Sequence, residues 1–374
     1  MSYINTYLSF TPGPTQLDGR VLNSMSTQVI THLNEGWGPY YLSVCDKLNK
    51  IINNTGDCFP MLCSGSGGVE SLVVSSVAPG EKLLVLTNGL FGDRFGEIAD
   101  AYNLDKEVLR FGPQEALDPE KLRERLSQGC DDIAAVSMAY SESQTGMLNP
   151  VKEIAAVCHE FNKPILVDMI SAAGGVPFDM DGWEVDLAVG AMQKCLGGTV
   201  GITCVFVRES AWEFLLSKKP LGYYFSLQFW RTSMHSYIDD PTSGPHPHPF
   251  SMSETLMVAA STACDIILEE GLDNMIARHR EVYEYYKKEL TALGFRMYQS
   301  DAYASPACIS IYPHERIGAL ELAERLKRDF GIMVGVGIGP MKPLLWRIGN
   351  MADQARMYKA VVLVNAIKSI LADC

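Results

Sequence analysis

The sequence predicts an α/β protein in which a mostly parallel central sheet is flanked by helices and followed by a smaller α+β domain. Two patterns favour this fold class. Short apolar runs alternate with longer stretches in which apolar residues recur every three or four positions. The apolar runs also lack polar residues at alternate positions, as expected for strands that are buried on both faces of a parallel sheet.

The predicted elements follow one another in an order that fits such a sheet. Strands are expected at residues 82–87, 133–139, 164–169, 187–192 and 203–207. Helical spacing of apolar residues is found at 69–77, 119–126 and 151–161. A long helical tract begins at Ser253, and a short apolar run and an amphipathic helix follow it. We therefore predict an N-terminal arm at 1–16, a large domain at 17–262 and a small domain at 263–374.

Composition argues against several classes of protein. The 374 residues include 44 acids and 31 bases, and the net charge of −13 disfavours nucleic acid and anionic membranes as partners. The N-terminus lacks the pattern of a signal peptide, and no run of about 18 apolar residues follows, so we expect a cytoplasmic protein. The ten cysteines show neither C-x-x-C pairs nor zinc-finger spacing, so we expect neither disulfides nor a metal site.

One lysine stands where a predicted strand ends. The segment LAVGAMQKCLGGTVG places Lys194 between an apolar run and a cluster of glycines. A lysine amine at such a position can form a Schiff base with a carbonyl compound, and its flexible stem lets it act afterwards as a base. The adjacent Cys195 is explained most simply as a small core residue, although its role stays open. Lys194 is therefore the first candidate for a catalytic residue.

Two further segments carry groups that can interact with a charged ligand. CSGSGGVESL leads into a helix, so Ser66, Gly67 and Gly68 can offer free backbone N–H groups and a hydroxyl to a phosphate. Glycines are also needed in a tight turn without any ligand. Asp168 ends a buried strand, where a carboxylate must have a partner. A helix cap or a structural ion pair is the alternative there.

Two more residues complete a set. Phe91, in NGLFGDRFG, can lie flat on a heterocycle or simply fill core space. Arg347, in LLWRIGN, can form a fork onto the carboxylate of a ligand or an ordinary ion pair with one of the many acids. Pyridoxal 5′-phosphate (PLP) is the cofactor that uses a phosphate cradle, an acid for a ring nitrogen, an aromatic neighbour and a lysine together.

With these segments the chain resembles the class V, fold type I PLP-dependent aminotransferases, close in pattern to alanine–glyoxylate, serine–pyruvate and 2-aminoethylphosphonate–pyruvate transaminases. The resemblance extends over nearly the whole chain and is carried by TPGPT, SGSGGVES, NGLFGDR, SESQTGMLNP, VDMISAAGGVPFDMD, AMQKCLGG and RIGN. It implies the fold type I transferase fold and amino-group transfer from a small amino acid, alanine or serine, to glyoxylate or pyruvate. Transamination of 2-aminoethylphosphonate and a PLP-dependent lyase on the same scaffold are the alternatives.

The resemblance also implies roles around the cofactor ring. Lys194 would form the Schiff base and then move the proton, and Asp168 would hold the protonated pyridine nitrogen. Phe91 would stack on the ring, where relatives often carry Trp or Tyr. Ser143 would bond the ring oxygen.

Further roles follow for the phosphate and the substrate. The residues that the resemblance assigns to the phosphate are Ser66, Gly67, Gly68 and Gln193. Arg347 would bind the substrate α-carboxylate, with help from the backbone of Gly13. A protein that merely binds the cofactor is disfavoured, because lysine, acid and arginine are all present.

The chain departs from the family pattern in the loop GPHPHPF. Relatives supply a threonine of the partner subunit to the cofactor phosphate, and here Ser243, His246 or His248 is the candidate substitute. A structural loop role is the alternative for both histidines. The resemblance implies a homodimer with the active site at the interface. The lyase alternative is disfavoured, since no cysteine shortly precedes the terminal arginine and Cys308 falls in a predicted strand.

Overall fold

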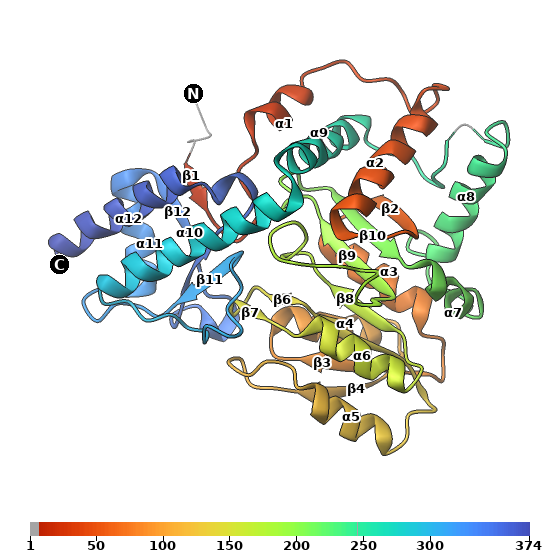
Figure 1. The fold of residues 1–374 in the computed structure, drawn as a ribbon, viewed down its shortest axis with the longest axis horizontal. Coiled ribbons are helices and arrows are strands. Elements are labelled where there is room, and N and C mark those ends of the chain that lie inside the picture. The colour runs from red at the N-terminus through yellow and green to blue at the C-terminus, as the bar shows by residue number, and fades with distance from the viewer. Residues whose placement is uncertain (1–6, 245) are drawn as a thin grey trace.

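The computed structural model describes residues 7–244 and 246–374 and contains a large and a small sheet (Figure 1). The strand order in the large sheet is β2, β10, β9, β8, β5, β3 and β4. The bounds are β2 Asp57–Leu62, β3 Lys82–Thr87, β4 Asp105–Arg110, β5 Ile133–Ala139, β8 Ile165–Asp168, β9 Leu187–Ala191 and β10 Ile202–Val207. β10 is antiparallel to both neighbours, whereas the other pairs are parallel. The predicted mostly parallel sheet and its five predicted strands are confirmed.

Helices cover both faces of the large sheet. Those of this part of the chain are α1 Gly19–Ser24, α2 Trp37–Ile52, α3 Gly65–Ser76, α4 Leu90–Ala101, α5 Pro119–Ser127, α6 Val151–Glu160, α7 Trp212–Leu216, α8 Leu227–Asp239 and α9 Glu254–Glu270. Thr203 and Cys204 are adjacent in β10, so they face opposite sides of the sheet. A methyl group added to Gly68 of α3 would lie 2.4 Å from Thr203, whereas Cys204 interacts with Cys45 of α2. α3 and α2 therefore pack on opposite faces.

The small sheet has the strand order β1, β12, β13 and β11. Its strands are β1 Leu8–Phe10, β11 Cys308–Ile311, β12 Ile332–Val336 and β13 Trp346–Gly349, and its helices are α10 Leu272–Ala292, α11 Ala319–Phe330 and α12 Met357–Ala372. Short elements complete the chain: β6 Ser141–Glu142, β7 Met147–Leu148, η1 Glu209–Ala211, η2 Gly339–Met341 and η3 Ala352–Gln354. Figure 1 shows β1 beside β12, although the two strands lie at opposite ends of the sequence.

The predicted arm is in part a strand. β1 pairs in parallel with β12, and Phe10 is buried in the hydrophobic core beside the small sheet. The predicted boundary between residues 262 and 263 falls inside α9, whose buried residues up to Ile267 belong to the hydrophobic core around the large sheet. The division of the chain into domains at that point stays a prediction.

The strands that sequence reasoning missed have clear reasons. β2 contains Pro60 and begins with Asp57, both of which are unfavourable in strands. β4 is an edge strand with charged residues, half exposed along its length, so it lacks the apolar run that identifies its neighbours. Of the helices in the described residues, none has the length and apolar character needed to cross a membrane.

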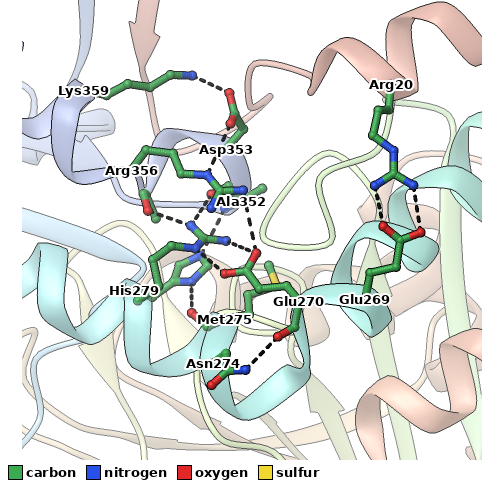
Figure 2. Close-up of polar contacts among 12 residues, drawn as sticks. Arg20, Glu269, Glu270, Asn274, Met275, His279, Ala352, Asp353, Arg356 and Lys359 are labelled. Carbon is green, nitrogen blue, oxygen red and sulfur yellow. Dashed lines mark hydrogen bonds and ion pairs between the residues drawn. The ribbon is translucent and has the colours of Figure 1, made fainter.

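A cluster of charged residues fixes the segment after β13 to α9 and α10 (Figure 2). We call Glu270, Arg278, His279, Asp353, Arg356 and Lys359 the junction cluster. Arg278 donates to both carboxylate oxygens of Glu270 and to the carbonyls of Ala352 and Ala355. Arg356 lies 3.7 Å from Glu270 and 3.6 Å from Asp353, and Lys359 also pairs with Asp353.

A buried histidine completes the junction. His279 donates through Nδ1 to the carbonyl of Met275 at 2.7 Å and accepts the N–H of Ala352 through Nε2 at 3.1 Å. Burial lowers the pKa of His279 to about 4, so the ring is neutral and can accept that bond. Ala352 has a φ of 50°, which is unfavourable for a residue other than glycine. The cluster therefore holds the backbone after β13 in one defined conformation.

Candidate active site

A cavity of about 200 Å³ lies where β8 and β9 end and where α3 and α4 begin. Its lining includes five of the residues predicted from the sequence: Ser66, Phe91, Asp168, Gln193 and Lys194. Ser64, Arg94 and Ile170 also line it. Open α/β sheets bind ligands at the carboxyl ends of their strands, and both helix N-termini are favourable for an anion. The cavity is therefore the candidate active site.

Lys194 follows β9 by three residues and extends along the N-terminal segment. Its Nζ donates to the carbonyl oxygen of Pro12. A Cβ at Gly13 would lie 2.5 Å from Lys194 Cδ, and Gly13 has a φ of 86°, so glycine is required beside the lysine. Burial lowers the pKa of Lys194, which favours the neutral, nucleophilic amine. The structure thus brings Gly13 and Lys194 into contact.

Asp168 is the last residue of β8 and is 5% exposed. Its Oδ1 accepts the N–H of Ile170 at 2.8 Å. Burial raises the pKa of Asp168 to about 6, while that hydrogen bond and the charges of Lys194 and Arg94 act in the opposite direction. A buried carboxylate with this little compensation is stabilised by a cationic N–H group, such as a protonated ring nitrogen.

The glycines at the start of α3 require a correction. The N–H groups of Gly67 and Gly68 are not free, because both donate to the carbonyl of Ser64, at 2.9 and 3.4 Å. No hydrogen bond among the described residues uses the N–H of Gly65 or Ser66, so the amides open to an anion lie two residues earlier and include that of the predicted Ser66. Gly68 instead allows close packing, since a Cβ there would lie 2.4 Å from Val189 as well as from Thr203.

Gln193 contributes an unsatisfied amide beside Lys194. Its Oε1 is buried and has no hydrogen-bond partner in the part of the chain that the structure describes. Its backbone carbonyl accepts the N–H of Thr15 at 3.1 Å, which ties the N-terminal segment to this turn. A buried polar group left without a partner costs about 1–3 kcal/mol, so a ligand that bonds this carboxamide gains from it.

Phe91 is placed by a buried acid that sequence reasoning missed. The N–H groups of Phe91 and Gly92, in the first turn of α4, donate to Oε2 of Glu142 at 2.8 and 3.1 Å. The N–H of Gln144 donates to Oε1 at 3.0 Å. Glu142 is fully buried, and burial raises its pKa to about 7 despite these bonds. The isolated acid in the uncharged segment SESQTG was the available signal.

Arg347 and Ser143 are in contact at the small sheet, outside the residues that line the cavity. Arg347 lies in β13, is 6% exposed and donates through Nη1 to the carbonyl of Ser143 at 2.6 Å. Its Nε and Nη2 donate to the carbonyl of Val336 at 3.0 and 2.8 Å. Among the described residues no acid pairs with it, so the alternative of an ordinary ion pair is wrong. The guanidinium retains its charge for a ligand.

Arg94 is a second residue that sequence reasoning missed. It lies one helical turn after Phe91 on α4, and its Nη1 donates to Ser66 Oγ at 2.7 Å. The spacing of three residues in FGDR was the available signal, because residues three apart share a face of a helix.

Cys195, and His246 and His248 of the loop GPHPHPF, have partners within the chain. The Cys195 thiol is buried against the carbonyl of Ser171, and burial raises its pKa to about 12, so it is a protonated core group. His248 accepts the indole N–H of Trp37 at 2.7 Å, and burial lowers its pKa to about 3. His246 stacks on His248 at a centroid distance of 4.0 Å. These contacts favour a structural role for both histidines.

Ser243 is likewise bonded within its own loop. Its hydroxyl donates to the carbonyl of Ser236 at 3.0 Å, and the residue is exposed. That this loop replaces a phosphate ligand in a partner subunit stays a prediction for Ser243 as for the two histidines.

The cavity fits one cofactor. A lysine and a buried carboxylate face an aromatic residue, and free helix amides lie beside an unsatisfied carboxamide. This donor set matches an aldehyde, a ring nitrogen, a heterocycle and a phosphate in one molecule, so fold and site define a PLP-dependent enzyme. Residues 62–360 match the family described as aminotransferase class-V. The chain belongs to that family, which confirms the resemblance seen in the sequence.

Relatives of known sequence or structure agree with this assignment. An uncharacterized aminotransferase of Methanocaldococcus jannaschii is 29% identical over 91% of this chain and 86% of that protein. The 2-aminoethylphosphonate–pyruvate transaminase of Bacteroides fragilis is 29% identical over 93% of this chain and 94% of that protein. The crystal structure of alanine–glyoxylate aminotransferase from a Nostoc species superposes with a TM-score of 0.91 at 25% identity, and covers 98% of this chain and 96% of that chain. The protein is thus a PLP-dependent aminotransferase that acts on amino and oxo acids.

Proposed function

We propose that this enzyme transfers the amino group of a small amino acid, alanine or serine, to glyoxylate or pyruvate. The observation that carries the proposal is Arg347, a buried guanidinium held by backbone carbonyls with no acid beside it among the described residues. Such a group binds a carboxylate in a fixed orientation. Arg347 is not among the residues that line the cavity, whose cationic side chains are Lys194 and Arg94, and Arg94 is bonded to Ser66. A donor with a single carboxylate fits this arrangement.

The proposed roles of the residues follow from their environments. When bound, PLP supplies an electron-withdrawing ring that weakens the Cα–H bond of the amino donor. Lys194, whose pKa is lowered by burial, takes that proton and returns it at a different carbon. Asp168 holds a proton at the ring nitrogen, which keeps the ring a strong acceptor. Arg347 orients the carboxylate, and Ser66 and Gln193 hold the phosphate.

The phosphonate donor is the second candidate. A guanidinium binds a phosphonate as well as a carboxylate, and the Bacteroides relative is named for 2-aminoethylphosphonate and pyruvate. The lyase alternative is disfavoured, because Cys308 is buried in β11 and donates to the carbonyl of Ser143 rather than standing on a mobile loop.

The visible absorption spectrum distinguishes these donors. The holoenzyme is mixed separately with L-alanine, L-serine, 2-aminoethylphosphonate and L-cysteine, without any oxo acid. We expect alanine or serine to bleach the yellow band of the lysine-bound cofactor and glyoxylate or pyruvate to restore it. Bleaching by the phosphonate alone would select the second candidate. Sulfide released from cysteine without an oxo acid would select the lyase.

A homodimer with the active site at its interface and a cytoplasmic location are parts of the same proposal. The ten cysteines, all within the described residues, are free thiols, which suits a reducing compartment. Light scattering coupled to gel filtration measures the mass of the active species, and a stable, active monomer would contradict the dimer.

A further inference from the structure

Arg94 directs its guanidinium toward Ser66, in the first turn of α3. It donates through Nη1 to Ser66 Oγ at 2.7 Å, and both residues line the cavity with Gln193 and Lys194. An arginine is a donor only, so in this bond the serine hydroxyl is the acceptor. The hydroxyl proton of Ser66 is therefore free to be donated to another group.

The charge of Arg94 is not neutralised by its other contact. Its Nε donates to Glu97 at 3.0 Å, and the two side chains are 30% and 58% exposed. A partly exposed pair at this spacing contributes little, so Arg94 keeps most of its field. That field reaches the carboxylate of Asp168 across the cavity.

The phosphate end needs more positive charge than the helix alone supplies. An α-helix N-terminus is equivalent to about half an elementary charge, whereas a phosphate monoester carries nearly two negative charges. Gly67 and Gly68 have already used their N–H groups within the first turn of α3. Arg94 is the remaining cation beside Ser66 in the cavity lining, because Lys194 contacts Pro12.

We propose that Arg94 is a positioning residue for the cofactor phosphate: it holds Ser66 Oγ so that the hydroxyl donates its proton to the phosphate, and it supplies charge to that end. This inference rests on the proposed placement of the phosphate against α3. It does not depend on which amino donor the enzyme uses.

Cofactor affinity tests the role without a measurement of activity. Apoprotein of the wild type, Arg94→Gln and Arg94→Lys is titrated with PLP and with pyridoxal, which lacks the phosphate. We expect Arg94→Gln to raise the Kd of PLP about 10- to 100-fold and to change that of pyridoxal less than about twofold. Arg94→Lys should recover part of the loss. Equal losses for both compounds, or none for PLP, would overturn the role.

A matched control lies at the end of β4, beside the helix that carries Arg94. Arg110 pairs with Asp93, the residue before Arg94, and it is not among the residues that line the cavity. Arg110→Gln should leave both affinities unchanged. If it reduces PLP affinity as much as Arg94→Gln does, general charge rather than position explains the effect, and the inference fails.

Two further readouts separate positioning from a merely structural role. The ³¹P signal of bound PLP should titrate nearer to pH 6 in Arg94→Gln than in the wild type, because the dianion loses its stabilising charge. In a double-mutant cycle with Ser66→Ala, the loss from Arg94→Gln should shrink, since Arg94 acts through Ser66. Additive losses would mean independent action and would overturn the positioning role. If no donor bleaches the visible band while these results hold, the proposed donors fail and the role of Arg94 stands.

Discussion

The turn at residues 193–197 lines two cavities, and the buried charges beside these cavities differ in whether they are paired. Lys194 lines the candidate active site, whereas residues 195–197 line a smaller cavity of about 30 Å³ beside the junction cluster. In the junction cluster each acid is paired with arginine or lysine, as Figure 2 shows for Glu270 and Asp353. Within the described residues, Lys194 and Asp168 form no ion pair at all.

This difference separates structure from chemistry. A buried charge is expensive, so a protein pairs it wherever its task is to hold the fold. An acid and a lysine kept apart in one cavity are costly to the chain alone and become favourable when a ligand supplies the missing partners. The paired cluster therefore indicates a structural junction, and the unpaired cavity indicates the site of reaction.

The two lysines give the strongest test of this comparison. Lys194→Ala should reduce steady-state transamination at least about 1,000-fold and remove the yellow band, because the covalent attachment and the proton carrier are both lost. Lys359→Ala, in the junction cluster, should keep turnover within about twofold and lower the free energy of unfolding by about 1–3 kcal/mol. Initial rates and urea denaturation measure the two effects. Retained multi-turnover activity in Lys194→Ala would remove the central claim.

Asp168 in the cavity and Asp353 in the junction cluster should differ in the same way, the first affecting turnover and the second stability. Asp168→Asn should lower kcat about 100-fold with little loss of stability, since the partner of the ring nitrogen loses its charge. Asp353→Asn should mainly lower the melting temperature, because Arg356 and Lys359 lose their shared acid. The comparison breaks if Asp353→Asn reduces kcat as strongly as Asp168→Asn does.

The pH dependence of stability should have opposite signs at Glu142 and Glu270. Burial raises the pKa of Glu142 to about 7, so the folded state binds the extra proton and this contribution to stability falls as the pH rises from about 4.5 to 7. The pKa of Glu270 is lowered, because the hydrogen bond and charge of Arg278 outweigh burial. Its contribution is present above about pH 4.3 and is lost as the pH falls.

Glutamine variants isolate these contributions. Between pH 5 and pH 8, the free energy of unfolding of Glu142→Gln should fall by about 1–3 kcal/mol less than that of the wild type. This comparison allows for the hydrogen bond that the amide cannot accept. Glu270→Gln should instead reduce the loss of unfolding free energy that occurs as the pH falls below about 4.3. Urea denaturation at several pH values measures both, and equal slopes in wild type and Glu142→Gln would contradict the buried acid.

The smallest effect is expected at the exposed pair of Arg20 and Glu269, which Figure 2 also shows. Both side chains are more than half exposed, at 52% and 59%. Solvent screens such a pair, so Arg20→Ala should leave kcat and the melting temperature unchanged within error. A clear loss of activity would mean that this paired surface contributes to catalysis. It would contradict the distinction between paired structural charges and unpaired charges at the active site.

Much of the fold could be predicted because the central strands are continuous apolar runs. The central β5, β8 and β9 are buried at every position, and such runs have no other stable environment. β1 could not be predicted, because its three residues are a strand only by pairing with β12, more than 300 positions away in the sequence. A strand of this kind has no local signal.

The candidate site was predicted unevenly for a similar reason. Asp168 ends one strand, and Lys194 and Phe91 follow two others that end at the same edge of the sheet, so their convergence was expected from topology. Glu142 and Arg94 were missed, since their importance lies in contacts with Phe91, Gly92 and Ser66 from other segments. The free N–H group of Ser66 was among those predicted, but Gly67 and Gly68 lie beyond the free amides, because local sequence does not show where the helix begins its hydrogen bonding.

The class of fold, the family and the residue types of the site are all recognisable from the sequence. These depend on apolar runs and on motifs that are local to each segment, so they can be recognised one segment at a time. The tertiary structure alone decided which charges are paired and which are open. Glu270 pairs with Arg356, whereas Arg347 donates to the carbonyls of Ser143 and Val336 and pairs with no acid among the described residues. Both results depend on how distant segments pack, and the cost of a buried charge depends on its neighbours in space.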